Sequence, residues 1–168
     1  MSYRLPRIEF WRQYYVDNLD IGAIASGACI SNKFELHMVG ESPWVNDYDI
    51  VLTQVDVFEL GSTQAKRNYK LFLCDGDYSA AVMGDAFTTG LSTSEADVSM
   101  IKGLLSFSAS YTDIELYKSV QYNREIYHRL SFSNASSATL YAQLINAGSS
   151  VTFDTTSKLL VICHFAQQ

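Results

Sequence analysis

Two acidic residues near the middle of the chain have the spacing that chemistry on a β-strand requires. Asp113 and Glu115 are two positions apart, so on a strand both carboxyl groups lie on one face. Paired carboxylates act as acid and base in glycosidases. Tyr111 and Tyr117 continue the same two-residue period on either side of this pair. We interpret this face as solvated, and we keep these four residues as the candidate ligand platform of an alternative, carbohydrate-binding function.

The three histidines do not form a metal-binding pattern. His37, His128 and His164 have no histidine partner at the short spacings of a local metal pair. A site formed only in the folded protein would have to combine His164 with Cys163 or with a carboxylate distant in sequence. We predict instead that His37 is exposed and that His128 packs with a satisfied hydrogen bond.

The motifs that mark common active sites are missing from the sequence. It contains no G-x-S-x-G, no G-x-x-x-x-G-K-[ST], no G-x-G-x-x-G and no H-E-x-x-H. Asp75-Gly76-Asp77 is similar to part of a calcium loop, but the closing Glu of the full pattern is missing, and Asp-Gly is ordinary turn chemistry. We therefore predict that the protein is not an enzyme and has no cofactor or metal site.

Length, charge and cysteine usage narrow the class of protein. With 168 residues, 48% of them hydrophobic, the chain is long enough for a domain with its own core. The formal net charge of −6 argues against a sequence-independent grip on nucleic acid and against binding to an anionic membrane. The three cysteines, Cys29, Cys74 and Cys163, lie far apart in apolar surroundings. They predict buried free thiols and a reducing compartment.

Alternation of apolar and polar residues fills most of the chain. In residues 33–39, Phe34, Leu36 and Met38 share one face, which is typical of a half-buried strand. The strand predicted at 158–166 is apolar on both faces and should be central. Residues 154–157 should form the hairpin loop that precedes it. The predicted strands are 29–39, 49–60, 68–74, 104–109, 111–118, 124–133, 138–145, 149–153 and 158–166.

One short helix interrupts these strands. Ser92 and Glu95 have the spacing of a capping box, and Val98, Ile101 and Leu105 follow as a helical stripe. Many short antiparallel strands with a single helix predict an all-β fold, an antiparallel β-sandwich or jelly roll.

The first residues fit the strand pattern poorly. We assign residues 1–27 to an N-terminal arm or extension and residues 28–168 to the sandwich, with a first strand of the main sheet as the equal alternative. The aromatic residues of this segment are candidates for a protein interface, because buried aromatic anchors dominate binding energy. They are Phe10, Trp11, Tyr14 and Tyr15. An arm predicts that deletion of residues 1–27 leaves a folded domain but abolishes assembly.

The C-terminal third of the chain, residues 139–168, resembles the closing hairpin of structural proteins on tailed-bacteriophage particles. Residues 51–60 and 69–73 add to this resemblance, which covers about half of the chain and includes no diagnostic motif. No functional residue therefore carries over. The resemblance implies a β-sandwich or jelly-roll subunit, often trimeric, that decorates a capsid or forms part of a tail or fibre. It also implies synthesis in the host cytoplasm, with which the free cysteines and the missing signal peptide agree.

These observations predict a non-enzymatic structural subunit of a virus particle, a capsid cement or decoration protein that stabilises the assembly through protein–protein contacts. The expected partners are other virion proteins and copies of the same chain, with a trimer favoured, and neither nucleic acid nor membrane. The alternatives are a tail or fibre component, a carbohydrate- or receptor-binding module, and a hydrolase or metal enzyme whose site forms only in three dimensions.

Overall fold

The computed structural model describes residues 8–37, 50–61, 67–107, 112–114, 119–130 and 139–167, with the backbone alone described for 8, 50, 107, 112–114, 119–130 and 167. No helix in these ranges is long and apolar enough to cross a membrane. The elements are β1 (Ile8–Val16), β2 (Ala23–Ile24), β3 (Phe34–His37), β4 (Ile50–Leu60), β5 (Tyr69–Cys74), α1 (Glu95–Met100), β6 (Ile101–Phe107), β7 (Thr112–Ile114), β8 (Ser119–Leu130), β9 (Thr139–Asn146), β10 (Val151–Thr152) and β11 (Lys158–Gln167).

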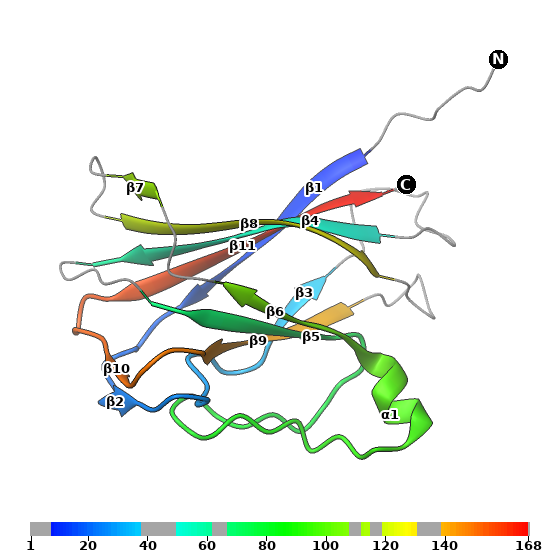
Figure 1. Ribbon diagram of the computed structural model, residues 1–168, viewed down its shortest axis with the longest axis horizontal. Coiled ribbons are helices and arrows are strands. Elements are labelled where there is room, and N and C mark those ends of the chain that lie inside the picture. Colours follow the sequence, from blue (N-terminus) through cyan, green and yellow to red (C-terminus); the bar gives the residue numbers. More distant parts are fainter. Residues whose placement is uncertain are drawn as a thin grey trace.

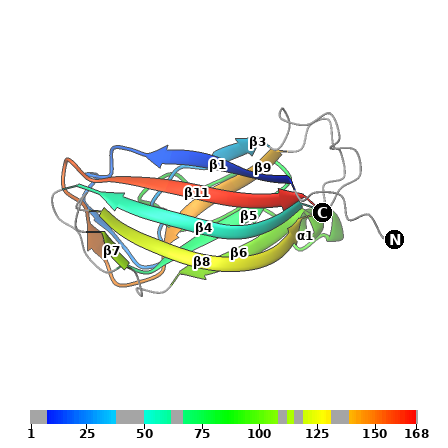
Figure 2. The same ribbon diagram turned by 90° about the horizontal axis from the view of Figure 1, so that it is seen from above.

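The long strands form two antiparallel sheets that face each other (Figure 1, Figure 2). The larger sheet has the order β1-β11-β4-β8-β7, and the smaller has the order β3-β9-β5-β6. Along the chain, β1, β4, β8 and β11 belong to the larger sheet, while β3, β5, β6 and β9 belong to the smaller one. Apart from the short edge strand β7, each sheet contributes four antiparallel strands, and the connectivity of these eight forms two interlocked Greek keys. The fold is a jelly roll.

Apolar side chains fill the space between the sheets because each strand alternates. In β3, Phe34 and Leu36 are buried while Glu35 and His37 are exposed. In β11, Leu159, Val161, Cys163 and Phe165 point inward in the same way. The position of β11 between β1 and β4 confirms the prediction that this doubly apolar strand is central.

The outer face of the smaller sheet has a cover of its own. Phe72 and Cys74 of β5 pack with Tyr78, Phe87 and other residues of segment 75–94 in a second hydrophobic cluster. The buried Gln143 amide donates hydrogen bonds to the backbone carbonyls of Ser31 (3.1 Å) and Ala81 (2.7 Å), which fixes that segment to the sheet. Among the described residues, no segment covers the outer face of the larger sheet (Figure 1).

The N-terminal residues are part of the sandwich, which corrects their assignment to an arm. β1 pairs with β11 over its full length, from Ile8 opposite Gln167 to Val16 opposite Leu159. Val16, Leu19 and Ile24 lie in the main core. The first-strand alternative therefore describes residues 8–16, and a domain boundary at residue 27 would cut through the core.

The predicted helix is shorter than its apolar stripe. α1 begins after the N-cap Ser94, whose hydroxyl accepts a hydrogen bond from the backbone N–H of Asp97 (3.2 Å). The cap is thus two residues later than the predicted box at Ser92 and Glu95. Ile101 and Leu105 belong to β6 instead of the helix, because pairing of β6 with β5 overrides the local helical spacing.

The predicted hairpin at residues 154–157 is a turn between sheets. β10 pairs with β2, and β11 pairs with β1 and β4, so the two strands on either side of this turn do not pair with each other. The local turn chemistry was predicted correctly. One carboxylate oxygen of Asp154 accepts hydrogen bonds from the Thr156 N–H (2.8 Å) and from the hydroxyls of Thr156 (2.6 Å) and Ser157 (3.1 Å).

Candidate functional site

The candidate ligand platform falls almost entirely outside the described residues. Tyr111, Glu115 and Tyr117 are not among them. Asp113 lies in β7, where its backbone is opposite Val120 of β8, and its side chain is outside the described part. The His128 side chain is outside it as well. The carbohydrate platform therefore stays a prediction.

The four aromatic interface candidates are divided between two faces of β1. Phe10 stacks on Phe165 with 5.3 Å between ring centroids, and Tyr14 stacks on Phe34 at 4.2 Å. Both pack against the main core. Trp11 and Tyr15 point the other way, with exposed fractions of 62% and 47%. The two-residue period of a strand imposes this division, so Trp11 and Tyr15 alone remain candidates for surface anchors.

The outer face of the larger sheet brings His164 to a distant carboxylate. His164 Nε2 lies 2.9 Å from Oδ2 of Asp56, and the Gln54 amide donates to both oxygens of Asp56 at 2.9 Å. Asp56 is only 5% exposed. The register aligns Trp11, His164 and Gln54 in one row across β1, β11 and β4. This cluster satisfies a buried acid with two hydrogen-bonding partners.

All three cysteines lie in the described part of the chain, and their side chains are buried. Cys29, Cys74 and Cys163 are free and buried, as predicted. Cys163 points to the interior, away from the His164 ring on the outer face, and burial raises its pKa to about 12. Burial likewise raises the pKa of Cys29 to about 11. Since the thiolate is the nucleophile, these thiols are unsuited to catalysis.

The acids of the Asp75-Gly76-Asp77 turn are paired with lysines. Asp75 forms an ion pair with Lys102 at 2.8 Å, and Asp77 forms one with Lys33. The Lys33 ammonium also donates to the carbonyl of Tyr78 at 2.8 Å. In the described ranges no three His, Cys, Asp or Glu side chains converge as metal ligands.

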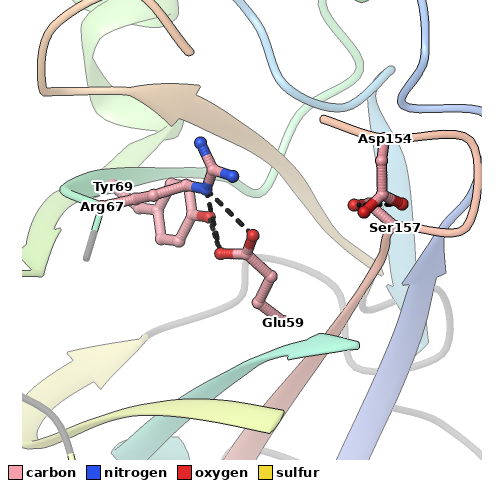
Figure 3. Close-up of polar contacts among 5 residues, drawn as sticks. All are labelled: Glu59, Arg67, Tyr69, Asp154 and Ser157. Atoms are coloured by element: carbon pink, nitrogen blue, oxygen red, sulfur yellow. Dashed lines mark hydrogen bonds and ion pairs between the residues drawn. The ribbon is translucent and has the colours of Figure 1, made fainter. Parts of the chain in front are cut away.

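A buried ionic cluster between the sheets was not predicted from the sequence (Figure 3). Glu59 of β4 is fully buried, and both of its carboxylate oxygens lie 3.0 Å from Nε of Arg67. The Tyr69 hydroxyl of β5 lies 3.4 Å from Oε2. The Arg67 guanidinium stacks over the Phe153 ring at 4.4 Å. One sequence signal was available, because Glu59 continues the inward period of Val55 and Val57.

This cluster joins the two sheets and has the properties of a structural element. Burial raises the pKa of Glu59, while the charge and hydrogen bonds of Arg67 oppose that rise. The Arg67 side chain is itself only 10% exposed. A buried carboxylate whose oxygens are already occupied by a guanidinium and a phenol is not available to a substrate.

Comparison with known proteins gives the following result. No protein-family model matches the chain, and no curated protein sequence matches it. Solved structures of viruses resemble it at low identity. A chain of the native virion of Kashmir bee virus at acidic pH is 13% identical, with 96% of this chain and 70% of that chain covered and a TM-score of 0.31. A chain of Desmodium yellow mottle tymovirus is 11% identical, with 99% of this chain and 90% of that chain covered and a TM-score of 0.28. A chain of Mud crab tombus-like virus is 10% identical, with 99% of this chain and 92% of that chain covered and a TM-score of 0.31.

Similarities with TM-scores this low carry no argument about what the chain does. The jelly-roll assignment rests on the strand connectivity of the protein itself. None of these three structures is named for a tailed bacteriophage, so the tailed-phage source stays a prediction.

Proposed function

We propose that the chain is a non-enzymatic structural subunit of a virus particle and acts through protein–protein contacts. The observation that carries this proposal is the jelly-roll connectivity of its two sheets. Jelly rolls occur in viral capsid proteins, lectins and cupins, and a fold alone does not decide between them. The described interior supports a structural role, because apolar side chains and the Glu59–Arg67 pair occupy it.

The exposed apolar side chains favour contact with other proteins. The large ones form two groups, one on β1 and the loops beside it and one on α1 and β6. They are Trp11, Tyr15, Ile21 and Val82 in the first group, and Val98, Ile101 and Leu104 in the second. Single exposed apolar residues are common, but groups at sheet edges are typical of interaction surfaces. Other virion proteins and further copies of this chain are the partners we propose.

A more specific role as capsid cement or decoration protein rests on the resemblance of residues 139–168 to tailed-phage structural proteins. In that role the subunit would attach to a shell formed by another protein, and a trimer is the favoured state. A tail or fibre component is the alternative within the same class. A carbohydrate- or receptor-binding module would require the platform at residues 111–117.

Light scattering and electron microscopy of the purified protein over a wide concentration range test this proposal. Closed shells or tubes would indicate a coat or tail protein, and small discrete oligomers would support a decoration protein. A strict monomer that binds glycans on an array would contradict the structural role and favour the carbohydrate-binding module.

A further inference from the structure

Within the described part of the chain, β1 is a long sheet edge without the usual protection against pairing. It is the first strand in the order of the larger sheet, and β11 lies on one side of it. Protected edges carry charged residues, proline or bulges, or are very short. β1 has nine residues, contains no proline or lysine, and pairs with β11 without a register shift. One of its two charged residues, Arg12, donates to the carbonyl of His37 at 2.5 Å and lies over the Phe10 ring.

A groove lies at the C-terminal end of this edge. Its volume is about 560 Å³, and Asp17, Asn18 and Asn32 line it together with apolar and aromatic side chains. The latter are Tyr14, Tyr15, Val16, Ile21, Val82 and Met83. Ile21 and Val82 are 50% and 58% exposed. Asp17 adds a carboxylate beside these apolar side chains. The groove therefore suits an extended segment that combines apolar and basic residues.

We propose that β1 pairs antiparallel with β1 of a second copy, about a two-fold axis at Gln13, and that residues 1–7 of each copy enter the groove of the other. This inference rests on the proposed structural role and names one contact between copies; the closed two-fold contact yields a dimer in place of the trimer favoured above.

The side chains of β1 favour this register. Antiparallel pairing centred on Gln13 places Trp11 opposite Tyr15 of the second copy on the outer face, and this occurs twice by symmetry. It places Arg12 opposite Tyr14 on the inner face. Cross-strand aromatic pairs are stabilising, and centring the axis on Arg12 would oppose two arginines in the middle of the contact. The Gln13 register instead brings Glu9 opposite Asp17 at each end, one residue past β1, where Lys158 at 3.0 Å from Asp17 offsets the repulsion. The two residues of each pair differ in number by an even amount, and side chains alternate between faces along a strand. Both members of a pair therefore lie on the same face of the sheet.

The residues before β1 match the groove in chemistry and position. In this register Phe10 of the second copy lies opposite Val16, so its residues 1–7 continue past Asp17 toward Ile21 and Val82. Their sequence is Met-Ser-Tyr-Arg-Leu-Pro-Arg. Asp17 already forms an ion pair with Lys158 at 3.0 Å on the exposed surface, so Arg4 or Arg7 would share its carboxylate, while Tyr3 and Leu5 suit the apolar side chains of the groove. Pro6 has no backbone N–H, which is compatible with an end to strand pairing before β1.

Cysteine cross-linking tests the register directly. Directly opposed residues of antiparallel strands have Cα atoms about 4.5–5.5 Å apart, within the range of a disulfide. The variant Gln13→Cys should form a disulfide-linked dimer of twice the 18.8 kDa chain mass under mild oxidation. The matched control Glu9→Cys should not form this disulfide, because the two introduced thiols of the dimer would lie about 27 Å apart along the strands. The wild type should not either, because its cysteines are buried.

Two further variants test the contact without cysteine chemistry. Trp11→Lys adds a charge to the exposed face of the edge and should convert the dimer to monomer in light scattering. Arg4→Glu combined with Arg7→Glu should weaken the dimer about tenfold, while Arg4→Lys with Arg7→Lys should not. Circular dichroism checks that each variant is folded.

Several results would overturn the edge pairing. They are cross-linking at Glu9→Cys in place of Gln13→Cys, a wild-type monomer at all concentrations, or a trimer whose mass Trp11→Lys does not change. A trimer or closed shell with an unaffected Trp11→Lys variant would refute this contact and leave the structural role standing. A dimer that cross-links at Gln13→Cys but binds glycans and never joins a larger assembly would support the β1 contact and refute the structural role.

Discussion

Glu59 and Arg67 form an ion pair inside the protein, with both Glu59 oxygens 3.0 Å from Arg67 Nε. Glu59 belongs to β4 of the larger sheet, and Arg67 lies two residues before Tyr69 of the smaller one. The chain therefore places a charge pair where most of the core is apolar. Removal of one partner of such a pair leaves the other charge buried and uncompensated.

We predict that Arg67→Met destabilises the protein by about 3–5 kcal/mol at neutral pH. Burial already raises the pKa of Glu59 above its ordinary value of 4.5, and loss of Arg67 removes the largest opposing influence. A raised pKa in the folded state means that Glu59 favours folding most when it is protonated, below pH 4.5, and that this contribution is lost as pH rises through the raised pKa. The deficit of Arg67→Met should therefore shrink on acidification.

Urea unfolding of wild type and Arg67→Met at several pH values measures this deficit. Lys158→Met is the control, because Lys158 pairs with Asp17 at 3.0 Å on the exposed surface, where an ion pair is worth about 0–1 kcal/mol. A deficit in Arg67→Met that stays constant down to acidic pH would contradict the role assigned to Glu59.

The covering segment of the smaller sheet should depend on Gln143. Gln143→Leu keeps the size of the side chain but leaves the carbonyls of Ser31 and Ala81 without their donor. We expect a loss of about 1–3 kcal/mol and faster proteolysis within residues 75–94. The exposed Gln13 offers a matched substitution, Gln13→Leu, which should leave proteolysis within residues 75–94 unchanged. Unchanged proteolysis in Gln143→Leu would show that the hydrophobic cluster alone holds the segment.

The two parts of the N-terminal region should respond differently to truncation. Deletion of residues 1–7 should leave the fold intact, because no described strand is lost, and should lower the melting temperature only as far as it weakens the proposed dimer. Deletion of residues 1–16 removes β1, exposes Phe165 and takes Val16 from the core, so it should unfold the protein or yield a molten state. Circular dichroism and calorimetry distinguish these outcomes. A cooperative unfolding transition in the longer deletion would restore the arm assignment.

The thiols should react only on unfolding. Because Cys29, Cys74 and Cys163 are buried and burial raises the pKa of each, a disulfide reagent at pH 8 should modify them at the rate of global opening. In urea above the unfolding midpoint all three should react at once. Rapid modification of any one in native protein would identify a local opening near it.

The sequence predicted strands well and their partners poorly, for a physical reason. Alternation is local, so β4, β5, β9 and β11 were located within one or two residues of their ends. Pairing is long-range, so nothing in residues 8–16 indicated that β11 would be their neighbour. The same limit explains why Asp154 was expected in a hairpin and is found in a turn between sheets.

The candidate sites were less predictable, because side chains that meet in the fold are far apart in the chain. His164 was noted as needing a distant carboxylate, but its partner Asp56 lies 108 residues away. Trp11 and Phe10 were grouped by residue type, and only the strand geometry separates them.

The unequal cover of the two sheets gives the molecule a front and a back. Segment 75–94 covers the smaller sheet, while the described part of the larger sheet carries Trp11, Tyr15 and His164 on an uncovered face. A two-fold axis perpendicular to the larger sheet would set both uncovered faces on the same side of a pair. The pair would then be a plate with one side built of strands and the other of loops, and only the first would offer a continuous flat surface for attachment.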